Sequence, residues 1–192
     1  MTGDPIEKFN EHLVKANEID HEFANACVLA TAGKDGKPAA RMVLIKQVND
    51  TGFVFFTNLG SRKARELVAN PNAALCFWWP QLQTQVRVEG TVKPVSTGEA
   101  DEYFDTRPRG SQIGAWASRQ SDVLPNHDIL LRSVEEVKRR YEGADVPRPP
   151  NWSGFRLKAD TIEFWYGRED RLHERYLYVR RGDRWETSML YP

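Results

Sequence analysis

A run of polar residues from Tyr103 to Ser121 contains side chains well suited to binding an anion. Arginines, serines and glutamines follow one another there, with glycines where the backbone can approach a ligand closely. The run is more polar than a core requires and more ordered than a linker. Because arginine and hydroxyl side chains are common partners of phosphate oxygens, it predicts a site for an anionic small molecule, in particular a phosphate ester.

Tyr103, Arg107 and Ser111 recur in this run at intervals of four residues. Tyr103 and Arg107 are expected to share one face of a helix that ends at Pro108, which would start the next helix at its first position. Ser111 then falls in the first turn of that second helix, where N–H groups remain free. A phenol, a guanidinium and a hydroxyl around a helix start form a phosphate cradle, whereas core packing explains Tyr103 but not Arg107.

A second group of cations begins a short helix that Ser61 is expected to cap. Arg62 and Lys63 fall in its first turn, where cations are unfavourable for the helix dipole unless an anion is present. A bound phosphate would remove that conflict; an exposed basic turn is the alternative. Arg41 and Lys46 lie at the two ends of a predicted strand and point to opposite faces, so they are expected to serve different partners, unless both ends are simply solvated.

A third group starts a predicted strand, where Arg171, His173 and Arg175 share a face by the period of two. Three cationic or titratable groups in a row repel one another unless something anionic or aromatic lies over them. Trp165 could pack in the core or lie beside a planar ligand, and its residue type alone does not decide between these. The remaining histidines are predicted to be ordinary surface residues: His12, His21 and His127.

The elements that must position these groups are mostly short strands. Asp4 and Pro5 predict a helix over about residues 4–17. Further helices are predicted at 62–69, from a capping box at 96–99, and at 128–141. Strands are predicted at 27–31, 40–47, 53–58, 73–79, 84–95, 154–157, 161–165, 172–180 and 184–190, the first three as an antiparallel meander. This pattern predicts a mainly β fold with peripheral helices (α+β), as one domain over residues 1–192 with a β-barrel-like core.

Composition narrows the class of protein. Lys+Arg and Asp+Glu both total 27, which argues against a general binder of nucleic acid or of acidic membranes. No apolar run reaches the ~20 residues of a membrane span, and Met1 to Pro5 do not begin a signal peptide, so a cytoplasmic location is expected. Cys27 and Cys76 lie in apolar runs and are expected to be reduced and buried. No glycine-rich dinucleotide or Walker motif is present in the sequence, and no metal site is expected.

Taken together, these segments resemble the pyridoxine (pyridoxamine) 5′-phosphate oxidase family over nearly the whole chain. The resemblance rests on Arg41-Met42-Val43-Leu44-Ile45-Lys46, Phe55-Phe56-Thr57-Asn58, Ser61-Arg62-Lys63, Gln85-Val86-Arg87-Val88-Glu89-Gly90, Tyr103-Phe104, Arg107-Pro108, Ser111-Gln112-Ile113-Gly114-Ala115, Ser118, Gln120-Ser121, Glu163-Phe164-Trp165 and Arg171-Leu172-His173. Single pieces are weak evidence, but their order and spacing make the set highly specific.

The resemblance implies a split β-barrel of the FMN-binding type, in a homodimer with two FMN molecules at the subunit interface. It assigns to the cofactor Arg41, Met42, Val43, Leu44, Ile45, Lys46, Phe56, Thr57, Arg62, Lys63, Gln85, Gln120, Ser121, Trp165 and Arg175. It assigns to the substrate Lys46, Tyr103, Arg107, Ser111, Arg171, Leu172 and His173. On this resemblance Arg41, Arg62 and Lys63 meet the flavin phosphate, and Lys46, Tyr103, Arg107 and Ser111 meet the substrate phosphate. These two sets match the first two cation groups found from the residues alone.

The implied reaction is hydride transfer from C4′ of pyridoxine or pyridoxamine 5′-phosphate to the flavin, with O2 reoxidising the flavin and H2O2 released. The product is pyridoxal 5′-phosphate, and the implied catalytic residues are Arg171 and His173. Two departures from the family pattern stand out. The chain begins close to its first helix, which puts a lid over the substrate in doubt, and it ends Met189-Leu190-Tyr191-Pro192 where relatives carry an arginine.

The sequence is also compatible with other functions. An oxidase of the same superfamily that acts on a phenazine precursor would keep the flavin residues but need not keep Tyr103, Arg107 and Ser111 together. A non-catalytic protein that stores or senses flavin or pyridoxal phosphate is a second alternative, against which Arg171 and His173 weigh. A structural domain without a cofactor would leave the organised cation groups unexplained.

Overall fold

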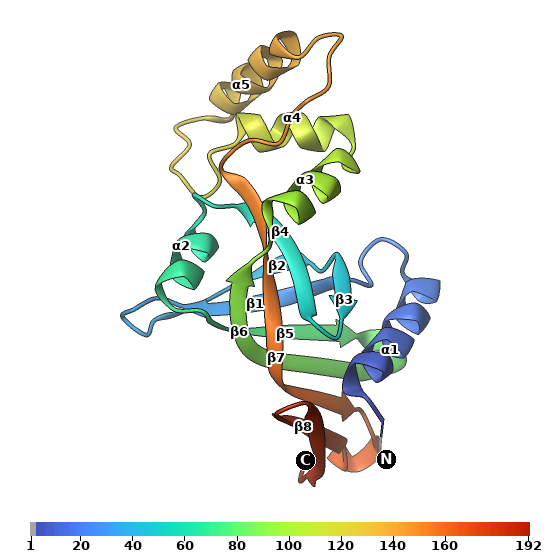
Figure 1. The fold of residues 1–192 in the computed structure, drawn as a ribbon. Coiled ribbons are helices and arrows are strands. Elements are labelled where there is room, and N and C mark those ends of the chain that lie inside the picture. The colour runs from blue at the N-terminus through green and yellow to red at the C-terminus, as the bar shows by residue number, and fades with distance from the viewer. Residues whose placement is uncertain (1–2) are drawn as a thin grey trace.

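A curled antiparallel sheet forms the centre of the computed structural model, which describes residues 3–192 (Figure 1). Its nine strands are β1 (Ala26–Ala32), β2 (Pro38–Leu44), β3 (Gln47–Asn49), β4 (Gly52–Asn58), β5 (Asn72–Trp79), β6 (Thr84–Pro94), β7 (Trp152–Tyr166), β8 (Glu174–Arg181) and β9 (Arg184–Leu190). The helices are α1 (Pro5–Ile19), α2 (Arg62–Ala69), α3 (Thr97–Asp105), α4 (Arg109–Ala117) and α5 (His127–Arg140), with 3-10 turns η1 (Pro80–Leu82) and η2 (Glu169–Arg171). The mainly β class with peripheral helices is confirmed.

The long strand β7 organises the sheet. The main strand order is β2-β1-β5-β6-β7-β4-β3, and β8 also pairs with β7 and continues to β9. The first part of β7 pairs with β4 and its last part with β8, while β6 runs along most of its length. The register between β6 and β7 shifts at Glu89 and Gly90, where the bulge lets the strands bend. This curling closes the sheet around a core.

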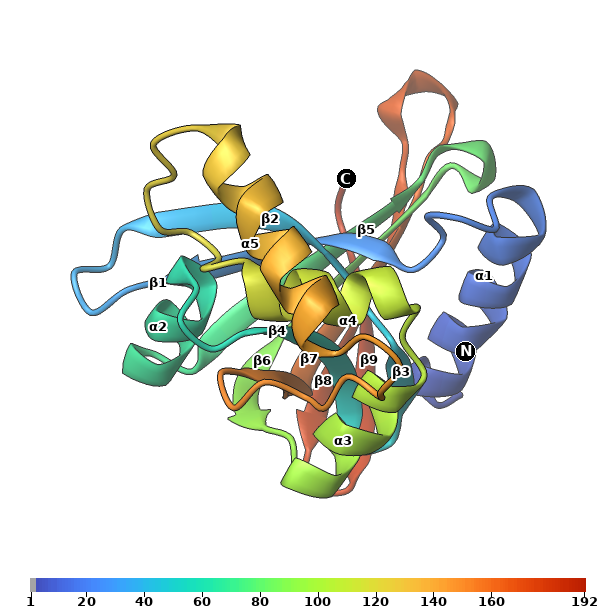
Figure 2. The same cartoon turned by 90° about the horizontal axis from the view of Figure 1, so that it is seen from above.

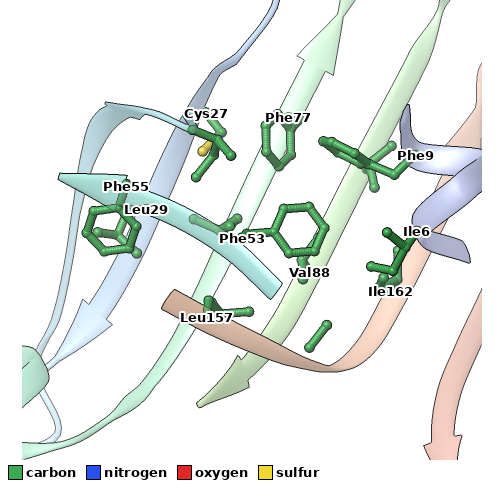
Figure 3. Close-up of a cluster of buried hydrophobic side chains, with 14 of the residues drawn as sticks. Ile6, Phe9, Cys27, Leu29, Phe53, Phe55, Phe77, Val88, Leu157 and Ile162 are labelled. Atoms are coloured by element: carbon green, nitrogen blue, oxygen red, sulfur yellow. The ribbon is translucent and has the colours of Figure 1, made fainter. Parts of the chain in front are cut away.

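Aromatic side chains fill that core. Phe9 from α1 meets Phe53 edge-to-face at 5.0 Å and Phe77 at 4.8 Å between ring centroids, and all three are fully buried (Figure 3). Such edge-to-face pairs are favoured by the charge distribution of the rings. The helix α1 therefore closes one end of the curled sheet. It begins where Asp4 and Pro5 predict, and the Asp4 side chain accepts a hydrogen bond from the Ile6 amide at 2.7 Å.

Helices α3, α4 and α5 gather at the other end, away from β8 and the C-terminus (Figures 1 and 2). The capping box of Ser96 and Glu99 is present at the start of α3. A small separate core between α4 and α5 is built from Ile113 and Val137. No helix among residues 3–192 is long and apolar enough to cross a membrane.

Three predictions about the elements are wrong. The first three strands form no meander, because β2 is an edge strand paired with β1, whereas β4 pairs with β3 and β7. The run predicted at 40–47 breaks at Ile45, whose amide bonds to the Asn25 carbonyl and whose side chain enters the core. The strands predicted at 154–157 and 161–165 are one strand.

Three smaller corrections concern single residues. Pro108 is the residue before α4 and not its first helical residue. His12 is half-buried and not an ordinary surface residue. Its Nδ1 donates to the Lys8 carbonyl at 2.8 Å, and its Nε2 lies 3.1 Å from the Tyr166 hydroxyl. Cys76 is only half-buried. The predicted domain also includes Met1 and Thr2, which lie outside the described residues.

Candidate active site

A cavity opens where the end of β4 meets α3, α4 and the start of β7. It encloses about 910 Å³, part of it open to solvent, and is lined by Met42, Val43, Leu44, Lys46, Phe56, Thr57, Asn58, Lys63, Tyr103, Arg107, Gly114, Ala115, Ser118, Gln120 and Trp152. Three of these residues are cations, and none of this lining set is acidic. The cavity brings together ten residues that the sequence assigns to cofactor or substrate: Met42, Val43, Leu44, Lys46, Phe56, Thr57, Lys63, Tyr103, Arg107 and Gln120.

Lys46, Tyr103 and Arg107, which the resemblance assigns to the substrate, lie together in the cavity lining. Burial and the adjacent Arg107 charge lower the pKa of Lys46, and burial lowers the pKa of Arg107 as well. The Nη1 atom of Arg107 is buried without a hydrogen-bond partner among residues 3–192. Two desolvated cations beside each other are unfavourable alone, so this wall is suited to an anion.

Three aromatic rings lie against one another beside these cations. The Phe56 ring stacks on Tyr103 at 4.1 Å and on Trp152 at 5.3 Å between centroids, nearly parallel in both cases. The guanidinium carbon of Arg107 lies 4.8 Å from the Trp152 ring centroid. Trp152 was missed from sequence, because its place opposite Asn58 depends on the β4–β7 pairing.

Lys63, Thr57 and Gln120 form the opposite wall. The Lys63 ammonium and the Thr57 hydroxyl both donate to the Gln120 side-chain oxygen, at 3.0 and 2.9 Å. Burial, followed by the charge of Arg41, lowers the pKa of Lys63. Thus two donors from β4 and α2 converge on one acceptor oxygen.

Arg41 and Arg62 meet at a carboxylate that sequence reasoning missed. Glu66 accepts from Arg41 Nη2 at 3.0 Å, from Arg62 Nε at 2.7 Å and from the Thr31 hydroxyl at 2.5 Å. Despite the cost of burial, these hydrogen bonds lower the pKa of Glu66. The helical i,i+4 spacing of Arg62 and Glu66 was the available signal. Glu66 thereby offsets part of the dipole conflict that the sequence assigned to a bound anion alone.

A second group of predicted site residues lies at the far end of β7. Gln85, Trp165 and Arg175 are paired across β6, β7 and β8 and therefore point to the same face of the sheet. Arg175 binds the buried carboxylate of Glu163 through Nε at 2.8 Å and Nη2 at 3.2 Å. The His173 ring lies against Trp165 at 4.4 Å between centroids. Trp165 therefore lies beside His173 and outside the core.

The segment just before β8 has an unusual backbone. Asp170 and Arg171 both have positive φ, at 53° and 60°, a conformation that costs energy for residues with a side chain. Arg171 and Leu172 are exposed, whereas His173 Nδ1 accepts from the Arg168 amide at 3.2 Å. That bond leaves the proton of a neutral His173 ring on Nε2.

Several predicted site residues are not in the cavity lining. Ser111 is exposed, and its amide bonds to the Pro108 carbonyl at 2.8 Å, so it is not a free helix-start donor. Ile45 is buried in the core. Ser121 is exposed with a φ of 75°, next to Gln120. Arg41 and Arg62 reach the cavity only indirectly, through Glu66 and the helix that carries Lys63.

Two family models match the chain. The model described as pyridoxamine 5′-phosphate oxidase matches residues 21–141, and the one described as the pyridoxine 5′-phosphate oxidase C-terminal dimerisation region matches residues 152–192. A pyridoxine/pyridoxamine 5′-phosphate oxidase of Myxococcus xanthus is 53% identical, covering 98% of this chain and 92% of its own length. One from Zymomonas mobilis subsp. mobilis is 50% identical over the full length of both chains.

Two solved structures are similar to this chain over nearly its whole length. PhzG from Burkholderia lata 383, in complex with tetrahydrophenazine-1-carboxylic acid, has a TM-score of 0.91 and 32% identity, covering 98% of this chain and 93% of its own. An FMN-binding protein from Nostoc punctiforme related to pyridoxamine 5′-phosphate oxidase has a TM-score of 0.78 over both full chains, at 18% identity. The second likeness confirms the split-barrel fold alone.

Proposed function

The chain belongs to the pyridoxamine 5′-phosphate oxidase family, and from that membership we propose that it is an FMN-dependent oxidase of vitamin B6 phosphates. It converts pyridoxine or pyridoxamine 5′-phosphate to pyridoxal 5′-phosphate, with O2 as electron acceptor and H2O2 as product. The observation that carries the proposal is the cavity with three cations and no acidic lining residue. A phosphate ester and a phosphorylated cofactor supply the anions that these cations need.

The residues of one wall fit the FMN phosphate. Lys63 and Thr57 already converge on one oxygen, that of Gln120, which is the geometry a phosphate oxygen requires. Arg41 and Arg62, held by Glu66, add positive charge beside that wall. When bound, FMN accepts the hydride from the substrate and passes the electrons to O2.

Lys46, Tyr103 and Arg107 hold the substrate phosphate in this proposal. Their donors face a part of the cavity where burial has already removed water from the cations, so an anion there meets less competition from solvent. Holding the phosphate, which takes no part in the chemistry, fixes the distance of C4′ from the acceptor and lowers the entropic part of the barrier.

Arg171 and His173 act at the ring of the substrate. The Arg171 guanidinium stabilises negative charge that develops on the pyridine ring, and the Nε2 proton of His173 is donated toward the C4′ substituent. Two observations support these roles: the positive φ of Arg171 marks a constrained site, and the His173 bond to the Arg168 amide fixes the ring.

The two groups of site residues support a homodimer with shared sites. Trp152 in the cavity and Trp165 beside His173 are thirteen residues apart on β7, up to about 40 Å along an extended strand. Figure 1 shows the α3–α5 end and the β8 end on opposite sides of the fold. A partner subunit must bring its β8 end to this cavity for the groups to meet. The match of residues 152–192 to a dimerisation region agrees.

One face of the sheet is suited to that contact. Val28, Met42 and Trp78 point out of β1, β2 and β5, with 36%, 61% and 48% of their surfaces exposed. Trp78 touches Trp165 at 6.0 Å between centroids, so this apolar face continues to the second group of site residues, around Trp165 and His173.

We also propose a cytoplasmic location, which rests on the sequence.

Flavin absorbance and turnover test the function. The purified protein is expected to carry FMN absorbance and, given pyridoxine 5′-phosphate and O2, to form H2O2 and pyridoxal 5′-phosphate in equal amounts. Bound flavin without turnover would indicate a flavin-binding protein instead. Turnover of tetrahydrophenazine-1-carboxylic acid in place of the phosphate ester would favour the activity suggested by the likeness to PhzG.

A further inference from the structure

The guanidinium of Arg107 is held differently from those of Arg41, Arg62 and Arg175. Arg41 and Arg62 share Glu66, and Arg175 binds Glu163. Within residues 3–192 the Arg107 side chain has no hydrogen bond or ion pair, and its neighbours are the rings of Trp152 at 4.8 Å and Phe104 at 5.5 Å.

This difference matters for an anion site. A carboxylate would occupy the N–H groups of an arginine and would repel an incoming phosphate. An aromatic face attracts the cation through its quadrupole and leaves the in-plane N–H groups free. The stacking therefore orients Arg107 without using the donors that a phosphate needs.

Trp152 is itself firmly placed. It is 5% exposed, its amide donates to the Pro149 carbonyl, and its carbonyl accepts from Arg148 Nη1 at 2.7 Å. Arg148 is fixed in turn by Asp101 at 2.6 Å. The same indole lies parallel to the Phe56 ring, which stacks on Tyr103.

We propose that Trp152 is a positioning residue for the phosphate subsite, holding Arg107 and, through Phe56, Tyr103 in the orientation that binds the phosphate group. This inference rests on the proposed function, in which those two side chains hold the substrate phosphate. Trp152 acts through them and takes no part in the chemistry.

Trp152→Leu removes the aromatic face and keeps an apolar side chain. We expect the KM for pyridoxine 5′-phosphate and the inhibition constant of inorganic phosphate to rise about tenfold, the effect of losing a desolvated cation–π contact. We expect kcat in the FMN-loaded variant to stay within about twofold, because the substrate phosphate takes no part in the chemistry once the substrate is bound. Trp152→Phe is expected to recover most of the loss.

The chain offers a matched control. Arg180 lies 4.3 Å from the Trp185 ring, an arginine–tryptophan pair outside the cavity. Trp185→Leu is expected to leave both constants unchanged. If Leu at position 152 prevents folding, Trp152→Met, whose flexible side chain fills irregular space, carries the same expectation.

Two results would overturn the proposal: unchanged constants in a folded, FMN-loaded Trp152→Leu or Trp152→Met variant, or equal losses in Trp152→Phe and Trp152→Leu. Failure of the proposed function is distinguishable. A wild-type protein that binds FMN but does not oxidise the ester would refute that function. The role of Trp152 would still be decided by the affinity of the same variants for inorganic phosphate, measured by calorimetry.

Discussion

Six cations among the predicted site residues fall into two classes, according to whether a carboxylate of the chain neutralises them. Arg41 and Arg62 bind the half-buried carboxylate of Glu66, and Arg175 binds the buried carboxylate of Glu163. Lys46, Lys63 and Arg107 have no ion pair within the described chain, and burial lowers the pKa of each. In the proposed function, the first class builds the frame of the site and the second binds the anionic ligands.

The lowered pKa of Lys63 predicts a pH dependence for cofactor binding. Burial disfavours the ammonium form, so Lys63 loses its proton below its ordinary pKa of 10.5. Above pH 7 the FMN phosphate stays doubly charged, since its second pKa is about 6. FMN affinity should therefore be constant below the lowered pKa and fall by up to about tenfold per pH unit above it, measured by flavin fluorescence between pH 7 and 9.5.

Lys63→Arg is the control for that measurement. Arginine keeps its charge throughout this range, so the variant should show a flatter profile even if its affinity at pH 7 is lower. Equal slopes for the two proteins would mean that some other group controls the pH dependence.

At the scale of elements, the sequence predicted what depends on local chemistry. The caps at Asp4, Ser61 and Ser96 fixed three helix starts within a residue, because a capping side chain bonds to amides two or three residues away. The hairpin turns between β1 and β2 and between β3 and β4 were also predicted, because turn residues act over a few neighbouring positions of the chain.

Strand partners could not be predicted in this way. Alternation of apolar residues says which face of a strand is buried and nothing of which strand lies beside it. The places of Trp152 and Glu66 in the site follow from the β4–β7 pairing and from the packing of α2 against β1. Ser111 lies in the first turn of α4 as predicted, but its amide already bonds to the Pro108 carbonyl, a contact that the spacing of four residues does not reveal.

The bulge between β6 and β7 is predicted to be essential for the curled sheet. At Gly90 a Cβ atom would clash with the Lys158 carbonyl oxygen, a backbone atom that cannot move aside without shifting β7. Gly90→Ala should therefore lower the free energy of unfolding by about 3 kcal/mol, measured by urea denaturation. Gly98→Ala in α3, where nothing lies within 4 Å, should change it by less than about 1 kcal/mol. Equal effects in both variants would contradict the role of the bulge.

At the scale of the whole molecule, one chain carries its two groups of predicted site residues at opposite ends of the fold. The cavity end presents Lys63 and Arg107, and the β8 end presents Arg171 and His173. β7 connects the two ends and, at fifteen residues, keeps them apart. In the proposed two-fold dimer, each cavity end meets the β8 end of the partner, and both sites are completed at once.

This arrangement predicts that two inactive variants can restore activity together. Arg107→Ala damages the cavity end and Arg171→Ala the β8 end, so each homodimer has two damaged sites. A mixed dimer has one site with both lesions and one with neither, so the purified mixed dimer should give about half of wild-type turnover per subunit. The variants are co-expressed with different tags, the mixed dimer is purified through both, and H2O2 formation is compared with each variant alone. If both ends served a site within one subunit, every site in the mixed dimer would carry a lesion, and turnover no greater than that of the separate variants would refute the shared site.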